Sequence, residues 1–229
     1  MAGRAERARS GRRVRTTPAQ PDLPDELTSA WLPDADLIDG VIHAGLSVHD
    51  LDLSDREAAG AELDQCRYSN VNFGQVRLRR ATFKDVHFER CDLANLRARE
   101  SSIRRVLVTS SRMTGFTWIT GSLNDVRFDG CRVDLGYFSG TKFSDVVFSD
   151  CRLDQANFGG ADLTDVRFEN CRLPGAQFSG ASLAETTFSG CDLTGITGVT
   201  SLRGATIAGS DAIALAGVFA EALGIKVED

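Results

Sequence analysis

Apolar side chains return at every fifth residue over more than half of this chain. The 27 positions at this interval from Leu63 to Leu193 are all apolar or aromatic. A helix packed on one side needs apolar residues at i, i+3, i+4 and i+7, and a half-buried strand needs them at every second position. An interval of five fits neither pattern. It requires a chain that turns a corner once in every five residues.

The residue two places before each central position is also restricted. It is Ala, Cys, Val, Ser, Thr or Gly in 25 of the 27 cases, and Leu96 and Phe116 are the exceptions. An extended segment points alternate side chains to the same side, so these two positions face inward together. Coils built in this way stack at about 4.8 Å, the strand spacing, and bury a column that a single coil could not bury.

Several five-residue segments resemble a known repeat. The segments ADLTD (161–165), CDLAN (91–95), CDLTG (191–195) and ANFGG (156–160) follow the consensus A(D/N)LXX of the pentapeptide-repeat family. This resemblance implies an all-β solenoid, a right-handed quadrilateral β-helix with four pentapeptides per coil. Residues four pentapeptides apart would then be stacked on one another.

A second period, four times as long as the first, is visible in the sequence itself. It relates Cys91, Cys131, Cys151, Cys171 and Cys191, and also Val86, Val106, Val126, Val146 and Val166. The stretch MTGFTWITG (113–121) is the least regular, and the large Phe116 at an inward position predicts a local bend or a widened coil. After Leu193 one residue is missing from the frame, so Leu202 and Ile207 become the next centres.

The repeat pattern divides the chain into four parts. We expect residues 1–35 to form a disordered arginine-rich tail, because they are polar and lack the repeat. Residues 36–60 are expected to form an irregular N-terminal cap with frayed first repeats, since Arg56 stands at an inward position. Residues 61–208 are the expected β-helix. Residues 209–229 are the expected C-terminal capping or dimerisation helix and tail.

The segment GSDAIALAGVFAEALG (209–224) changes to a helical pattern. Ser210 can cap a helix there, Asp211 suits its positive end, and Gly224 can terminate it. A helix this apolar must cover something. We therefore expect it to close the open end of the core and to form a homodimer. The residues predicted for capping and dimerisation are Ile213, Leu215, Phe219 and Leu223.

Charge is unevenly distributed along the repeats. Residues 51–112 carry twelve Lys and Arg against nine acids, and residues 113–210 carry seven against eleven. In the second half, acids recur at the same corners of the coil, which gives a candidate partner-binding ladder. Its predicted members are Asp125, Asp129, Asp145, Asp150, Asp165, Glu169 and Glu185. Such a ladder is either a set of solvated corners or a linear negative surface for a partner that normally binds nucleic acid.

Basic residues cluster on the first coils, among them Arg77, Arg79, Arg97 and Arg99. They could contact phosphate or an acidic protein surface. No aromatic residues alternate with them, so stacking of single-stranded bases is not expected. Direct nucleic-acid binding is therefore not the function that we expect of this chain.

The sequence offers no catalytic or metal-binding pattern. All six cysteines stand at the small inward position, where we expect buried, reduced thiols, and no CxxC pair suggests zinc. The three histidines are far apart in the chain. We expect no enzyme activity, no metal and no cofactor. Without an 18-residue apolar run or a secretory signal, a cytoplasmic protein with no membrane contact is expected.

The resemblance suggests a function. Relatives with a helix after the coils include quinolone-resistance proteins that bind DNA gyrase, and in that group the acidic rod imitates DNA. The resemblance therefore implies a DNA-mimicking binder of a type II topoisomerase that modulates the enzyme or protects it against inhibitors. The alternative is a generic scaffold for protein–protein interaction. Residues 51–210 carry nineteen bases and twenty acids, which leaves both hypotheses open.

Overall fold

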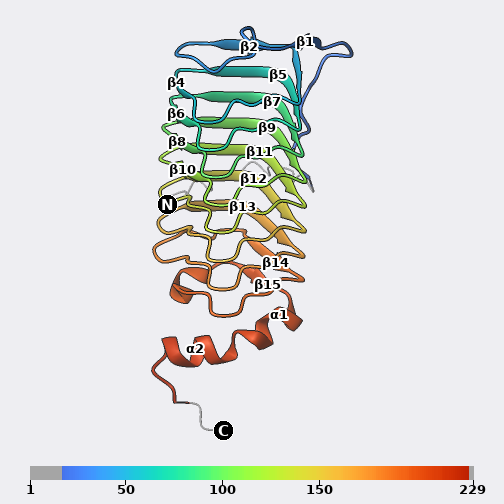
Figure 1. Cartoon of the computed structure of the whole chain (residues 1–229). Helices are drawn as coiled ribbons and strands as arrows, with labels where there is room; N and C mark the ends of the chain where they lie inside the picture. The colour runs from blue at the N-terminus through green and yellow to red at the C-terminus, as the bar shows by residue number, and fades with distance from the viewer. Residues whose placement is uncertain (1–16, 227–229) are drawn as a thin grey trace, which may run out of the picture.

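A computed structural model describes residues 17–226, which form a right-handed parallel β-solenoid of about nine coils (Figure 1). The coils stack along one axis, and two short helices lie at the C-terminal end (Figure 1). The strands are β1 (Thr28–Ala30), β2 (Ile42–Ala44), β3 (Leu46–His49), β4 (Glu57–Ala59), β5 (Glu62–Ser69), β6 (Arg77–Arg79), β7 (Thr82–Glu89), β8 (Arg97–Arg99), β9 (Ser102–Thr109), β10 (Thr117–Ile119), β11 (Ser122–Asp129), β12 (Lys142–Ser149), β13 (Asp162–Glu169), β14 (Thr187–Ser189) and β15 (Thr206–Ile207). The helices are the 3₁₀ helix η1 (Val199–Leu202), α1 (Gly209–Ala214) and α2 (Ala216–Ala222).

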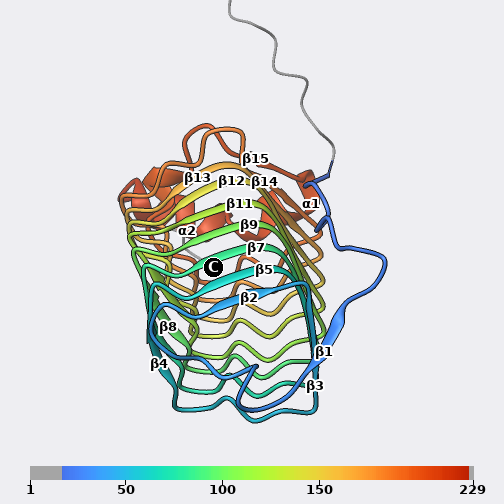
Figure 2. The ribbon, with the colours of Figure 1, turned by 90° about the horizontal axis from the view of Figure 1, so that it is seen from above.

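The strands of successive coils pair in parallel, and each residue is level with the one four pentapeptides further along the chain. Leu63 is level with Phe83, and Val126 with Val146. The path β1-β3-β5-β7-β9-β11-β12-β13-β14-β15 forms one sheet, and β10-β8-β6-β4 forms another. Seen from above, the coils follow one another as a series of similar, roughly four-sided loops, each displaced from the one before (Figure 2). The predicted quadrilateral β-helix is confirmed.

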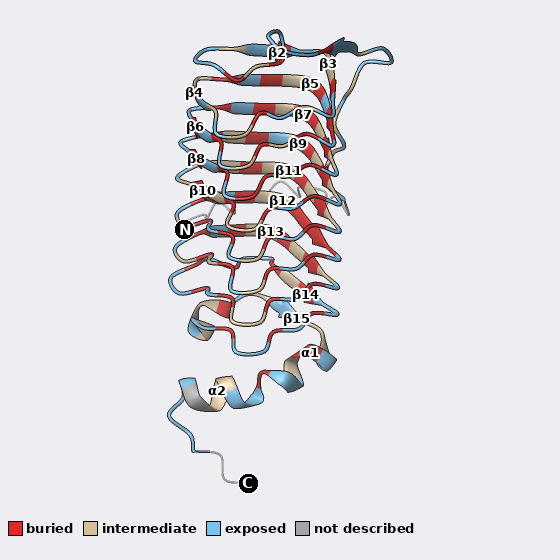
Figure 3. Cartoon of the chain, in the orientation of Figure 1, coloured by how far each residue is buried: buried red, intermediate tan, exposed pale blue. Residues whose placement is uncertain are grey.

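The core consists of side chains from the two inward positions, and buried and exposed residues alternate along each coil (Figure 3). Phenylalanines stack directly on one another from coil to coil. The ring centroids of Phe128 and Phe148 are 4.7 Å apart, and those of Phe168 and Phe188 are 4.9 Å apart. Stacked aromatic rings of this kind add to the stability that area burial supplies. The five-residue period is therefore the period of the core.

The segment 36–60 is more regular than predicted. Leu53 and Ala58 are buried at central positions, as in later coils. Arg56 occupies its inward position because its Nε donates a hydrogen bond to Asp36 Oδ1 at 2.7 Å, and both side chains remain partly exposed. An ion pair at the rim thus replaces an apolar contact without breaking the coil.

The prediction of a disordered tail over residues 1–35 is wrong for residues 17–35. Strand β1 pairs in parallel with β3, and Ala30 and Ala35 are buried. Backbone pairing fixes this segment although its composition is polar, and composition alone does not reveal such pairing. Residues 1–16 lie outside the described part of the chain.

The irregular stretch 113–121 keeps the register. Thr117 pairs with Arg97, so no break occurs there. Phe116 and Trp118 are both buried and stack with ring centroids 5.8 Å apart and an interplanar angle of 11°. Gly121 leaves room for the indole, whose Nε1 donates to the Ser101 carbonyl oxygen at 3.2 Å.

At the C-terminal end the predicted one-residue slip is confirmed, because Ile207 pairs with Phe188, nineteen positions before it. The single helix predicted for residues 209–224 is wrong: the chain bends at Leu215 between α1 and α2. The residue before α1 is Ala208, so Ser210 is not the cap. Asp211 is buried and accepts a hydrogen bond from Cys191 N at 2.8 Å, in place of a further coil.

Candidate protein-binding surface

One corner of the solenoid carries a row of carboxylates, here called the acidic column: Asp125, Asp145, Asp165 and Glu185. Their backbone φ angles are 54°, 54°, 54° and 60°, in the left-handed region that the corner requires. Asp and Asn adopt this conformation more readily than most residues, which accounts for part of their frequency at the corners. Because the sheet register is one full coil, neighbouring members of the column are about one strand spacing, ~4.8 Å, apart along the axis.

At the C-terminal end of the acidic column, the carboxyl of Glu185 is influenced by that of Asp165. A hydrogen bond to the Asp165 carboxyl, together with repulsion from its charge, raises the pKa of Glu185. A raised carboxyl pKa in an exposed group indicates that a neighbouring like charge resists a second ionisation. The two carboxyls at this end of the column therefore affect each other's ionisation.

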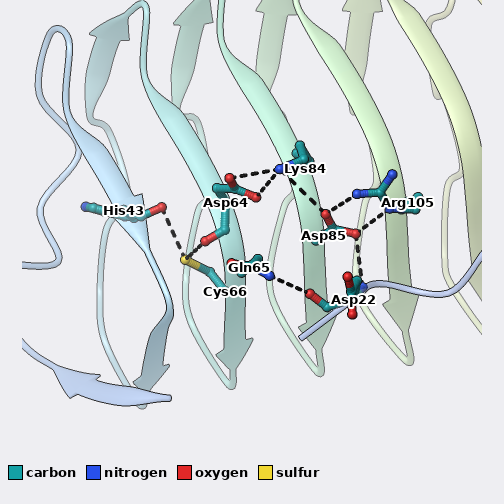
Figure 4. Close-up of polar contacts among 8 residues, drawn as sticks. All are labelled: Asp22, His43, Asp64, Gln65, Cys66, Lys84, Asp85 and Arg105. Carbon is teal, nitrogen blue, oxygen red and sulfur yellow. Dashed lines mark hydrogen bonds and ion pairs between the residues drawn. The ribbon is translucent and has the colours of Figure 1, made fainter. Parts of the chain in front are cut away.

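At its other end the same corner is neutralised. Asp85 is buried, and its two carboxylate oxygens accept hydrogen bonds from Arg105, one of them from Nε at 2.6 Å (Figure 4). Burial acts to raise the pKa of Asp85, but the bonds from Arg105 and from the backbone N–H of Asp22 outweigh it, so this pKa is lowered. Lys84 adds a positive charge, with Nζ 3.0 Å from Asp64 and 3.9 Å from Asp85.

The N-terminal segment lies along this corner, which the sequence did not indicate. The backbone N–H of Asp22 donates to Asp85 Oδ1 at 3.0 Å, and Gln65 Nε2 donates to the Asp22 carbonyl oxygen at 3.0 Å (Figure 4). Further along, the N–H of Ala19 donates to Asp125 Oδ1 at 2.9 Å. Pro18 is buried, so the segment packs against the rod as well as bonding to it.

The remaining predicted ladder residues lie apart from the acidic column. Asp129 and Glu169 stand at the ends of β11 and β13, where Arg127 and Arg167 pair with them at 3.1 and 3.8 Å. Asp150 is exposed at the next corner and accepts a bond from Ser149 Oγ at 3.0 Å. The seven predicted acids therefore form one column and three separate positions, not one continuous negative face.

A second charged row, at the position after the cysteines, is balanced. Arg112 pairs with Asp92 at 2.8 Å, and Arg152 lies 3.4 Å from Asp154 and 3.8 Å from Asp134. Each guanidinium in this row faces a carboxylate of its own or an adjacent coil. The row therefore contributes little net potential.

The basic residues of the first coils line a hollow of about 420 Å³ on the sheet β10-β8-β6-β4. Arg77 pairs with Glu57, whereas Arg79, Arg97 and Arg99 make no ion pair with any described residue. Positive and negative surfaces thus occupy different sides and different ends of the rod.

The repeat geometry agrees with sequence comparison. The family described as "Pentapeptide repeat region" matches residues 81–158 and 122–197, and "Pentapeptide repeats (8 copies)" matches residues 59–96. Together these matches cover more than half of the chain. The chain belongs to the pentapeptide-repeat family. Members of this family are generally non-catalytic structural or interaction proteins.

Solved structures similar to this pentapeptide-repeat chain come from several sources. HetL from the cyanobacterium Nostoc, involved in heterocyst differentiation regulation, is 18% identical, with 73% of this chain and 87% of that chain covered and a TM-score of 0.33. Trypsin-treated QnrB1, a plasmid-mediated fluoroquinolone resistance protein, is 21% identical, with 85% and 98% covered and a TM-score of 0.33. A pentapeptide repeat protein from the Arabidopsis thaliana thylakoid lumen is 20% identical, with 51% and 72% covered and a TM-score of 0.27. No curated protein matches the chain.

The cysteines of the pentapeptide coils are buried free thiols, and burial raises the pKa of Cys91 and of Cys191 to about 11. Their thiols bond to backbone carbonyls, as Cys171 Sγ does to Phe148 O at 3.3 Å. Among residues 17–226, no group of three or more His, Cys, Asp or Glu could hold a metal ion. His43 is buried at a central position, and its Nδ1 lies 2.8 Å from the Tyr68 hydroxyl.

The four residues predicted for capping and dimerisation fall into two groups, one packed against the core and one exposed. Leu215 is fully buried and Phe219 packs against the core, so these two close the last pentapeptide coil. Ile213 and Leu223 are 78% and 76% exposed and face away from it. No helix among the described residues is long and apolar enough to cross a membrane.

Proposed function

We propose that this chain is a non-catalytic, cytoplasmic rod that binds a type II topoisomerase, with DNA gyrase as the first candidate, by presenting its acidic column in place of DNA. The observation that carries the proposal is the acidic column itself, four carboxylates in register along one straight corner. A surface built for duplex DNA is lined with Lys and Arg spaced for phosphates. A rigid row of carboxylates is complementary to such a lining.

The charge spacing supports partial imitation of DNA. Stacked carboxylates recur about every 4.8 Å along the axis, whereas each strand of a duplex carries a phosphate about every 3.4 Å. One corner of the rod therefore offers about 0.7 of the charge density of a single DNA strand. The paired arginine row and the basic hollow cannot extend the imitation around the rod. The partner is thus expected to engage one edge.

We further propose a homodimer through exposed apolar side chains of α1 and of the residue that follows α2. Ile213 and Leu223 would be covered by a second copy, since side chains of this size gain free energy on burial. The C-terminal end is also where the acidic column ends. Two copies joined there would bring both columns toward the centre of a longer rod. The six free thiols are consistent with a reducing cytoplasm.

The second candidate function is a protein-interaction scaffold with no link to topoisomerases. The balanced charges of the Arg112 and Arg152 row favour it, because that surface offers flat, neutral, regularly spaced faces. A scaffold would bind through shape and would respond weakly to salt. The mimic would lose affinity as salt screens its charges.

The deciding experiment is gyrase supercoiling with increasing purified protein, with and without a quinolone. We expect inhibition of supercoiling or relief from the drug by the natural chain. The double variant Asp145→Lys/Asp165→Lys, which reverses the middle of the acidic column, should lose this effect.

A matched control keeps the same change in net charge elsewhere. Glu62→Lys/Glu100→Lys alters two exposed acids outside the acidic column and should behave like the natural chain. If both double variants lost the effect on supercoiling equally, net charge alone would account for it, and the acidic column would not be the binding surface. No effect of the natural chain at micromolar concentration would exclude this enzyme as the target and favour the scaffold.

A further inference from the structure

The side of the rod formed by β4, β6, β8 and β10 carries a compact group of positive charges, here called the arginine block (Figure 1). Arg77 and Arg79 stand on β6, and Arg97 and Arg99 stand level with them on β8. All four residues are exposed. Alternate residues of a strand point to the same side. The four guanidinium groups therefore project from one small area of the sheet.

The spacing within the arginine block follows from the strands. Level residues on neighbouring strands are about 4.8 Å apart, and alternate residues along one strand are about 6.6 Å apart. Like charges placed opposite each other destabilise a sheet. Arg77 forms an ion pair with Glu57, whereas Arg79, Arg97 and Arg99 form no ion pair with any described residue. Three guanidinium groups thus repel one another without a carboxylate of the described chain between them.

Stacked arginines elsewhere on the rod have carboxylates beside them. In the row after the cysteines, Arg112 pairs with Asp92 at 2.8 Å, and Arg172 lies 3.8 Å from Asp154. Stacking of arginines in register therefore does not by itself prevent ion pairing in this fold. The arginine block differs because its level positions supply too few acids. An anion from outside the chain would take the place that carboxylates take in the other row.

The arginine block lines the hollow of about 420 Å³, a volume typical of small-ligand sites. The basic area is only two strands wide. The positions level with it carry Glu57 and Ala59 on β4 and Thr117 and Ile119 on β10. Binding of a nucleic-acid backbone needs positive charge that continues along the backbone, and here it ends after two strands. The hollow therefore fits a compact anion better than an extended polymer.

Arginine is suited to phosphate groups. Its planar guanidinium stays charged and presents a fork of N–H donors that binds phosphate at two points. A second hollow of about 280 Å³ shares Arg77 and Arg97 with the first and is also lined by Gln75 and Asn95. Side-chain amides add neutral N–H donors to such a site. None of the described residues that line the two hollows is aromatic, so nothing there would stack on a base.

We propose that the hollow on β6 and β8 binds a small anion with two or three linked phosphate groups, held by Arg79, Arg97 and Arg99. Linked phosphates concentrate several negative charges in a small volume, so one molecule reaches all three guanidinium groups. The bound anion connects two neighbouring coils and relieves the repulsion between their arginines. This site lies on a different side of the rod from the acidic column, so it does not depend on the topoisomerase proposal.

The test is isothermal titration calorimetry of the whole chain with sodium triphosphate, at about 0.15 M NaCl, where the Debye length is about 8 Å. We expect one triphosphate to bind per chain. Arg79→Gln/Arg99→Gln should weaken binding about tenfold or more, because two sets of charge-assisted hydrogen bonds are lost. Both residues are exposed, so the thermal transition of the ligand-free variant should match that of the natural chain.

Two control variants separate the site from net charge. Arg112→Gln/Arg172→Gln removes the same charge from the paired row and should bind triphosphate like the natural chain. Arg79→Lys/Arg99→Lys keeps the charge but lacks the guanidinium fork, so we expect a severalfold loss of affinity. The proposal would be overturned by equal weakening in the two glutamine variants, or by no binding to the natural chain at about 1 mM triphosphate.

Two further ligands test the chemical class. ATP should bind no more tightly than inorganic triphosphate, because the hollow offers phosphate ligands and no stacking surface for the base. A short DNA duplex at the same phosphate concentration should bind more weakly than triphosphate. A clear preference for ATP would contradict recognition through the phosphates alone, and a clear preference for DNA would contradict a site for a compact anion.

Discussion

Gly121 shows how a single residue decides whether a large side chain fits inside a coil. A Cβ at this position would overlap the Ser101 carbonyl oxygen and the Trp118 indole nitrogen. Neither atom can withdraw, because one belongs to the paired backbone and the other is buried and hydrogen-bonded to that same oxygen. We expect Gly121→Ala to lower the free energy of unfolding by about 1–3 kcal/mol, as overpacking does, measured by urea denaturation.

The matched control is Gly159→Ala, where the new Cβ would lie 3.0 Å from Asn157 Oδ1 and in ordinary contact, at 3.5 Å, with the Ser179 carbonyl oxygen. Its effect should stay within about 0.5 kcal/mol, as for other surface substitutions. An equal loss in the two variants would mean that the Trp118 ring is not the cause.

The pair of Asp85 and Arg105 gives a second test at the residue scale. Asp85 is buried, so Arg105→Gln would leave a buried carboxylate without its partner guanidinium. Breaking buried pairs costs about 3–5 kcal/mol, and we expect a loss near the lower figure at pH 7 because Arg105 is partly exposed. Arg90→Gln, which breaks an exposed pair with Glu89, should cost about 0–1 kcal/mol.

The pH dependence of this loss has a definite sign. In the natural chain the pKa of Asp85 is lowered, so its stabilisation is present above the ordinary carboxyl pKa and disappears as the pH falls through the lowered value. In the variant, burial without a partner favours the protonated acid. The difference between the two proteins should therefore shrink below about pH 4. A difference that is constant from pH 7 to pH 3 would contradict this account.

Individual charges are where prediction from sequence reached its limit. The stacking period placed Asp129 and Glu169 on the rod correctly, but it could not show that Arg127 and Arg167 turn toward them. Side-chain pairing depends on rotamers and not on spacing. The burial of the cysteines was easier to predict, because a small side chain at an inward position of a coil is enclosed by the core.

Among the structural elements, the coils were predictable and the ends were not. The sequence pattern of the coils recurs at every fifth residue, so each repeat supports the same prediction. Strand β1 and the bend between α1 and α2 occur once each, and no repetition supports their prediction. Strand β1 depends on backbone pairing with β3, for which polar sequence gives no signal. The helix bends because Leu215 must enter the open end of the core while Asp211 bonds to Cys191.

Substitutions at the C-terminal end should affect dimerisation and stability separately. Ile213→Ser/Leu223→Ser changes only exposed side chains, so we expect the molar mass measured by light scattering to fall from dimer to monomer with little change in Tm. Leu215→Ala removes a fully buried side chain and should cost about 2–4 kcal/mol. A natural chain that is monomeric at micromolar concentration, or a double variant that stays dimeric, would exclude these side chains as the dimer contact.

The molecule as a whole is a one-dimensional stack. Each coil contacts mainly the coils before and after it, so stability is approximately a sum over coils and their interfaces. The register of four pentapeptides per coil is set at the corners, where φ must be positive at places such as Asp145 and Gly160. Alternation of inward and outward residues alone would allow one coil to shift by two residues against the next. The positive φ angles required at the corners do not allow that shift.

Excision of coils tests this directly. Deleting residues 146–165 joins Asp145 to Val166, removes one whole coil of four pentapeptides and leaves Phe128 to stack on Phe168. Deleting residues 146–163 preserves the alternation but moves every later corner two places out of register. We expect the first deletion to keep a cooperative thermal transition within about 5 °C of the natural chain, and the second to lower Tm by more than about 10 °C, since each kcal/mol shifts Tm by about 2–4 °C in a chain of this length. Similar melting of the two deletions by circular dichroism would show that alternation, and not the corners, sets the register.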